Sequence, residues 1–272
     1  MLNWAITAKT ARDSCVTVGL ASLATVGFVI LFVYAMVNMG TELLKFVSQF
    51  PFLKNIFELS LGIRVEGDVS INILLAVSFT HLVVVILAWG TIIAIVTRVS
   101  VGEVEQGTAD LLLSMPVSRF TVSVSTTLVW IFAAAQLAMC PLVGIWIGGR
   151  VFAGDDPIRF LSFVPVAINL FALHLAIGGL SQLVSGIANR RGIAIGVVVG
   201  IALVSVTLNF IEPFIQPIQR LRFMGLLHYF RPVDIVQTAR WPIQSCLVLL
   251  GIAIICWTIG TISFCRKDIP AP

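Results

Sequence analysis

The sequence has very little charge. Only 11% of its 272 residues are Asp, Glu, Lys or Arg, whereas a soluble domain carries about 25%. Hydrophobic residues make up 58% of the chain, and its mean hydropathy is +1.05. Such a composition cannot supply a normal water-exposed surface, so the chain is predicted to be a polytopic membrane protein.

Motifs for catalysis and ligand binding are also missing. The sequence has no GxxxxGK[ST] phosphate loop, HExxH or GxSxG, so we expect no ATPase site, enzyme activity, metal or cofactor in this chain. Its five cysteines form no CxxC pair, which favours small packing residues over a disulfide framework. The net charge of +4 is spread over the loops without an arginine-rich stripe. This distribution argues against nucleic acid and favours contact with membrane lipid headgroups.

Long stretches without charge dominate the rest of the chain. A transmembrane helix needs about 20 apolar residues, and each span must be helical because lipid offers the backbone no hydrogen-bond partner. The first stretch exceeds the apolar core of a signal peptide, which favours a retained helix over cleavage. The predicted fold class is therefore an all-α polytopic membrane protein, a single transmembrane domain over 1–272, with six spans at about 16–38, 71–97, 120–147, 160–187, 192–211 and 243–264.

Charge alone does not decide the orientation in the membrane. An even number of spans places both termini on one side. If that side is cytoplasmic, the inner segments hold eight Lys and Arg and the outer segments hold nine. The short Asn189–Gly192 turn and the pair Arg266 and Lys267 favour cytoplasmic termini, whereas the basic residues of the 212–242 loop oppose them. We expect short surface helices in that loop and in 40–68, where Pro51 would break them.

Polar and small residues inside the spans suggest two further roles. His81, Gln136, Asn169 and His174 are costly in lipid, so they either line a pathway or form hydrogen bonds between helices. No span carries Asp or Glu, which disfavours a proton relay. The second group is a set of glycines spaced four residues apart, Gly192, Gly196 and Gly200. They lie on one helix face and allow another helix to approach closely, either within the bundle or at a homodimer seam. For Gly144 and Gly148 we expect packing within the chain.

The one strongly patterned polar segment is GEVEQGTADLLLSMPVSR, Gly102–Arg119. Glu103 and Glu105 bring negative charge to the start of a predicted helix. Leu111–Leu113 then supply an apolar patch, and Pro116 is expected to end the helix. Two short helices parallel to the membrane would set acidic and apolar groups side by side, a surface that suits docking to a soluble partner. The alternative is an interfacial loop whose charges are solvated.

This segment resembles the cytoplasmic loop between the second and third helices of ABC-2 type ABC transporter permeases, usually written G-E-x-E-x-G-T-x-x-x-L-L-x-x-P-x-S/G-R. The resemblance implies that the coupling loop, 98–119, docks into a groove of a separate ATPase subunit. Most of the residues assigned to docking match this pattern, and the full set is Gly102, Glu103, Glu105, Gln106, Gly107, Thr108, Leu111, Leu112, Leu113, Pro116 and Arg119.

The same resemblance implies a larger assembly. Two permease copies would form a substrate pathway, with export favoured, and the first and fifth helices would make their seam. ATP and Mg would bind to the partner subunit, not to this chain. Residues from about Asn3 to Cys15 would form an elbow helix, both termini would be cytoplasmic, and the location would be the bacterial inner (plasma) membrane. Two alternatives stay open: an ABC-type mechanotransmission or assembly factor acting on an extracytoplasmic partner, and an ATP-independent carrier, which would predict inverted repeats.

Overall fold

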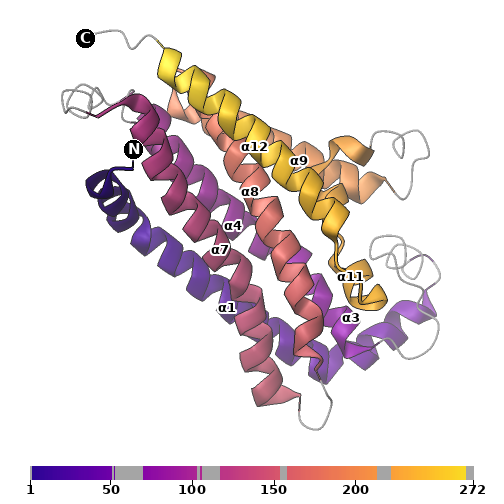
Figure 1. Cartoon of the computed structure of the whole chain (residues 1–272). Helices are drawn as coiled ribbons and strands as arrows, with labels where there is room; N and C mark the ends of the chain where they lie inside the picture. The colour runs from indigo at the N-terminus through magenta and orange to yellow at the C-terminus, as the bar shows by residue number, and fades with distance from the viewer. Residues whose placement is uncertain are drawn as a thin grey trace.

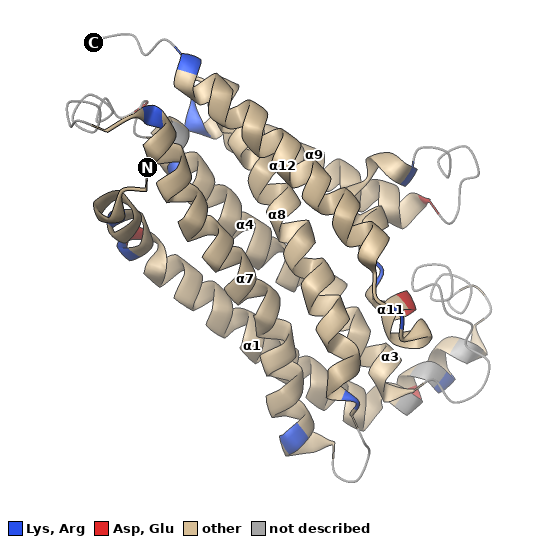
Figure 2. Ribbon diagram, in the orientation of Figure 1, with Lys and Arg blue, Asp and Glu red and all other residues tan. Residues whose placement is uncertain are grey.

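The computed structural model describes residues 2–50, 52, 70–102, 105, 117–153, 158–212 and 222–267. Six helices are long and apolar enough to cross a membrane, and they form one elongated bundle with both chain ends at the same end (Figure 1). Figure 2 marks the Lys, Arg, Asp and Glu residues of the described chain toward the two ends of the bundle, and none of them in its middle. The prediction of an all-α polytopic membrane protein with six spans is confirmed.

All regular elements in the described residues are helices. The elements labelled η are 3-10 helices, except for η2, which is a turn of π-helix. In chain order they are α1 (Trp4–Gln49), α3 (Ile71–Ala76), η1 (Val77–Thr80), α4 (Leu82–Thr97), η2 (Arg98–Gly102), α7 (Arg119–Phe152), η3 (Phe160–Phe163), α8 (Val164–Ile187), α9 (Arg191–Ile211), η4 (Arg222–Met224), η5 (Leu226–Tyr229), α11 (Pro232–Thr238) and α12 (Ile243–Arg266).

The first helix is much longer than a bilayer requires. With 46 residues, α1 is about 69 Å long at 1.5 Å per residue. Its charge-free part, between Asp13 and Glu42, spans about 44 Å, the thickness of a bilayer with its headgroups. The residues expected to form an elbow helix and the residues up to Gln49 are therefore both continuous with the first span. Residues 40–49 are helical as expected, and the helix ends just before Pro51, but they continue the first span and do not form a separate helix. The rest of the expected helical segments, in 53–68, lies outside the described residues.

The second span is broken, which the charge-free stretch 71–97 did not indicate. The chain passes from α3 through η1 to His81, whose extended backbone (φ −61°, ψ 135°) separates it from α4. The His81 Nδ1 accepts a hydrogen bond from the N–H of Val83, so this side chain caps α4. The hydroxyls of Ser78 and Thr80 donate to carbonyls of the preceding turn. These side chains satisfy backbone groups that a break in the helix would otherwise leave unpaired.

Helix α8 is central in the bundle and packs against α4, α7, α9 and α12. Its closest neighbour is α12, because glycines let the two backbones meet. A Cβ atom at Gly186 would lie 3.0 Å from the carbonyl carbon of Gly260, and one at Gly179 would lie 2.9 Å from the Cα of Ala253. This α8–α12 seam is the tightest helix contact that the glycines mark, and the sequence analysis did not single it out.

Hydrogen bonds between side chains reinforce the same region. The hydroxyl of Ser123 on α7 lies 3.0 Å from that of Thr261 on α12, and Gln182 on α8 donates to Ser123 over 3.2 Å. All three side chains are buried. The expected packing of Gly144 and Gly148 within the chain is also observed, against Val29 and Val33 of α1.

Candidate partner-docking site

The polar loop connects two helices at the end of the bundle that carries both chain termini (Figure 1). It leaves through η2, which continues α4, and returns at Ser118, whose hydroxyl accepts a hydrogen bond from the N–H of Thr121 and so caps α7. The two ends of the loop, called its roots below, are therefore each continuous with a membrane-spanning helix.

The first root is attached to α9. Gly102 lies against the side chain of Arg191, where a Cβ atom would be 3.4 Å from the arginine Cδ. Glu105 Oε2 then accepts a hydrogen bond of 2.9 Å from the backbone N–H of Arg191. Arg191 is the first residue of α9, so the Glu105 carboxylate satisfies an unpaired N–H group at the positive end of the helix. The start of the loop is thereby joined to the fifth span.

Arg191 also reaches across to the second span. Its Nε donates to Thr97 Oγ1 over 3.4 Å, and its Nη2 donates to the carbonyl oxygen of Ala94 over 3.2 Å. Both acceptors belong to the last turn of α4. One arginine thus holds α4 and α9 together with its side chain and holds the loop with its backbone.

The second root is attached to α8 and α12. Arg119 at the start of α7 donates to the carbonyl oxygen of Lys267 at the end of α12. The ammonium of Lys267 in turn donates to the carbonyl oxygen of Ala188 at the end of α8, and burial lowers the pKa of Lys267 below its ordinary value. Arg119 and Lys267 therefore tie the ends of three helices together beside the loop.

The N-terminal segment of α1 borders the same end of the bundle. Asp13 forms an ion pair of 3.3 Å with Arg98 of η2, and Arg98 also donates to the Asp13 carbonyl oxygen. Asn3 caps α1 with its side chain, while its backbone N–H donates to Ser125 Oγ of α7. Residues 3 to 13 are thus fixed next to both roots of the loop.

No protein-family model matches this sequence, and no curated protein matches it either. The resemblance of the loop to ABC-2 permeases therefore stays a prediction. The structure adds the position of the two roots of the loop, at one end of a six-helix bundle, and their attachment to different helices.

The structure brings together only part of the predicted docking set. Gly102, Glu105 and Arg119 are placed, and each contacts another helix of the same chain, as described above. Most of the set lies outside the described residues: Glu103, Gln106, Gly107, Thr108, Leu111, Leu112, Leu113 and Pro116.

The glycine face of α9 points away from the rest of the described chain. A Cβ atom at Gly192, Gly196 or Gly200 would meet nothing within 4 Å among the described residues. Large apolar side chains nearby on the helix are exposed, with Ile193 at 57% and Leu203 at 58%. Of the two interpretations that the sequence left open, packing within the chain is not observed in the described part of the molecule. The face is available to another helix.

The four predicted pathway residues do not come together. His81 caps α4 and lies 4.4 Å, ring centre to ring centre, from Phe28, and Gln136 donates to Ser22 of α1. Asn169 and His174 are both 0% exposed on α8. Their Oδ1 and Nε2 atoms have no hydrogen-bond partner among the described residues.

Sequence reasoning missed the residues that anchor the loop. Arg191 and Lys267 were counted only as charges that orient the chain, and Asp13 was not considered. Arg191 and Lys267 share one signal: each lies close to the end of a predicted span, where unpaired helix-end groups need partners. Asp13 carries no such signal, because it lies within α1.

Proposed function

We propose that this chain is the permease subunit of an ABC transporter and that its 102–119 loop docks a separate ATP-hydrolysing subunit. The loop pattern supports this proposal, because it combines acidic and apolar residues in one connection of a chain that is otherwise membrane. The six-helix bundle and the common end of the termini agree with it. That end would face the cytoplasm of a bacterium, where ATP and Mg bind to the partner.

The two anchored roots suggest how motion passes from the loop into the membrane. A displacement of the loop would pull α4 and α9 through Glu105 and Arg191. It would pull α8 and α12 through Arg119 and Lys267. ATP-driven movement of the docked subunit would thus act on two groups of helices at once, and their relative movement would change the access of a pathway. The partner drives this change only if it binds the two arrangements with different affinities.

The open face of α9 supports a homodimer as the working unit. Gly192, Gly196 and Gly200 allow another backbone to approach closely, which is how helices associate in lipid. Because Glu105 caps the same helix, the loop would act directly on the helix at the proposed seam. Dimerisation would then place two docking loops at one end of the assembly, one for each ATPase subunit.

Affinity purification of the tagged chain from its own membranes tests the docking proposal. The wild-type protein should bring down a stoichiometric ATPase, detected by mass spectrometry and phosphate release. The variant Glu103→Lys should lose it, because reversed charge opposes a complementary surface. Glu105 is left unchanged in this test, because its carboxylate caps α9. Glu42→Lys, an exposed acid at the far part of α1, is the matched control and should keep the partner.

A single variant separates docking from transmission. Glu105→Gln removes the negative charge at the α9 terminus but keeps an acceptor oxygen, so the ATPase should still bind while substrate-stimulated ATP hydrolysis falls. Monodisperse elution in detergent verifies that each variant is folded. Purification of the wild-type chain without any ATPase, or equal recovery of the ATPase with Glu103→Lys and Glu42→Lys, would reject the proposed docking role.

A further inference from the structure

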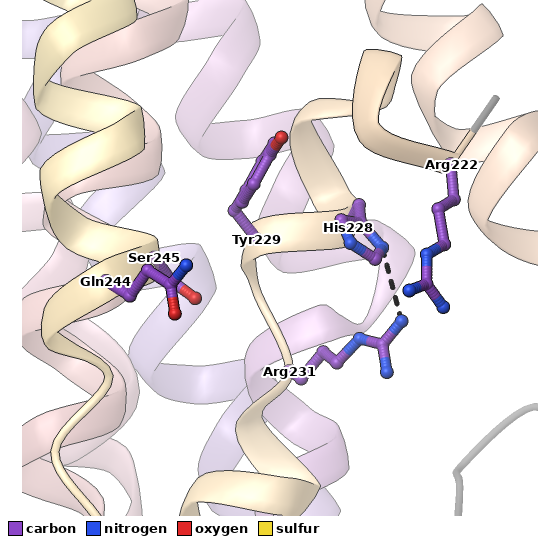
Figure 3. Close-up of a pocket in the computed structure, with 6 residues that line it drawn as sticks. All are labelled: Arg222, His228, Tyr229, Arg231, Gln244 and Ser245. Carbon is purple, nitrogen blue, oxygen red and sulfur yellow. Dashed lines mark hydrogen bonds between the residues drawn. The ribbon is translucent and has the colours of Figure 1, made fainter. Parts of the chain in front are cut away.

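A second polar site lies at the other end of the bundle, far from the loop. The chain forms a pocket of about 320 Å³ between η4, η5 and the first turn of α12. Figure 3 shows the arginine and histidine side chains on one side of it and the side chains of α12 on the other. The described residues that line it are Arg222, His228, Tyr229, Arg231, Gln244 and Ser245.

An acidic residue behind the pocket holds the basic groups in place. Glu212 at the end of α9 is only 12% exposed and lies 3.4 Å from Arg231, 3.7 Å from His228 and 4.0 Å from Arg222. Asp234 adds a looser contact of 3.8 Å to Arg231. The two acids offset the charge of the two guanidinium groups, but neither is among the described residues of the pocket wall. The wall therefore presents donors, while the balancing carboxylates stand behind it.

Several of these donors remain available to a ligand. Arg222 lies 4.0 Å from Glu212, beyond hydrogen-bonding distance, and a guanidinium carries five N–H groups. Arg231 Nη2 bonds to His228 Nδ1 over 3.2 Å. Since a guanidinium can only donate, His228 Nδ1 is the acceptor, and the neutral ring carries its proton on Nε2. The imidazole thus offers one more donor besides the two arginines.

The α12 side of the pocket adds further polar groups. Gln244 and Ser245 belong to the first turn of α12, whose N-cap, Pro242, provides no side-chain hydrogen bond. N–H groups in the first turn of a helix have no partner within the helix, and the helix dipole makes this end positive. Tyr229 is fixed by a hydrogen bond from its hydroxyl to the carbonyl oxygen of Phe223. The combination of arginine donors and a positive helix end favours a compact oxyanion, and arginine suits phosphate in particular.

The surroundings of the pocket indicate what carries the phosphate. Phe223 and Met224, which follow Arg222, are 60% and 65% exposed, and Trp241 and Ile243, which precede Gln244, are 57% and 65% exposed. Tryptophan is enriched at the membrane–water interface, and α12 starts its membrane span here. A polar pocket with an apolar border at this depth matches an amphiphile whose headgroup is acidic.

We propose that this pocket binds a phosphate group presented by the headgroup of an acidic membrane lipid. The site is independent of the proposed ATPase docking, because it lies at the opposite end of the bundle and involves none of the loop residues. A bound lipid would bridge η4 and η5 to α12, and so would link the end of α9 to the start of the last span.

The test uses the purified full-length chain in a neutral detergent and three probes: dihexanoyl phosphatidylglycerol, dihexanoyl phosphatidylcholine and inorganic phosphate. Affinity is measured by titration calorimetry. Arg222→Gln is the diagnostic variant, because it removes donors without leaving Glu212 unpaired. Arg240→Gln, an exposed arginine outside the pocket, is the matched control. Thermal unfolding of each variant reports whether it is folded. If Arg222→Gln does not fold, Gln244→Ala on the opposite wall replaces it as the diagnostic variant.

We expect phosphatidylglycerol to bind the wild type more tightly than phosphatidylcholine does. Loss of one charged donor should weaken this binding roughly tenfold in Arg222→Gln, with no change in Arg240→Gln. If inorganic phosphate displaces phosphatidylglycerol and binds with equal affinity, the pocket is a phosphate site, but the proposal that a lipid supplies the phosphate is wrong. Equal binding of the two lipids would overturn the acidic headgroup as the ligand, since phosphatidylcholine also carries a phosphate. Equal loss in Arg222→Gln and Arg240→Gln would overturn the site itself.

Discussion

The contact between α8 and α12 makes a sharp prediction about glycine. Replacing Gly186 by Ala adds one methyl group whose carbon would lie 3.0 Å from the carbonyl carbon and 3.2 Å from the Cα of Gly260. Carbon atoms in favourable contact are about 3.5–4.0 Å apart. The carbonyl oxygen of Gly260 would be closer still. These neighbouring atoms are backbone and cannot rotate away, so the two helices must separate by at least about 0.5 Å.

The cost of this separation follows from the surroundings. Overpacking of a tight contact costs about 1–3 kcal/mol. The nearby hydroxyls of Ser123 and Thr261, 3.0 Å apart, would move toward the limit of hydrogen bonding, and such bonds between membrane helices contribute about 0.6 kcal/mol on average. Against this, Ala gains up to about 1 kcal/mol over Gly in helix propensity. The net expectation for Gly186→Ala is a loss of about 1–2 kcal/mol in the free energy of unfolding.

Gly196→Ala is the matched control, because the same methyl group would meet nothing within 4 Å among the described residues. It should leave the stability of the monomer unchanged or raise it by up to about 1 kcal/mol. Reversible unfolding in mixed micelles with increasing SDS measures both variants. If Gly186→Ala proves as stable as Gly196→Ala, the close approach of α8 and α12 is wrong. Cross-linking in liposomes adds a second result, since a reduced dimer yield in Gly196→Ala alone is expected from a seam on α9.

Two further predictions concern histidines. Burial, followed by the charge of Arg231, lowers the pKa of His228 below its ordinary value of 6.5, with Arg222 adding to the shift and Glu212 opposing it. A phosphodiester bound beside the ring would raise this pKa, so binding takes up protons. Affinity for dihexanoyl phosphatidylglycerol should therefore rise as the pH falls from 8 to 5, and His228→Gln should abolish this dependence. His81→Ala should destabilise the chain by about 1 kcal/mol through loss of the α4 cap, whereas His81→Asn, which can also cap, should restore most of it in the same SDS unfolding assay.

The six spans could be predicted because lipid imposes one simple condition, an uninterrupted apolar stretch of sufficient length. Breaks in helices are different. The interruption at His81 depends on the hydroxyls of Ser78 and Thr80 and on the imidazole bonding to particular backbone groups. Hydropathy gives these residues no special weight, so 71–97 was predicted as one continuous helix. The glycines of the α8–α12 seam escaped notice for a related reason, because Gly186 and Gly260 meet across two helices that are far apart in sequence.

The loop shows most clearly where sequence reasoning stops. Glu103 and Glu105 looked equivalent, two acids at the start of one short helix, and both were assigned to basic groups on a partner. Yet Glu105 accepts a hydrogen bond from the N–H of Arg191, 86 residues later in the chain. A carboxylate that caps a helix of its own protein is not free to serve as a simple contact for a partner. Charge reversal there should act first on α9, so a transport defect in a Glu105 variant is evidence about transmission, and docking must be judged from residues elsewhere in the loop.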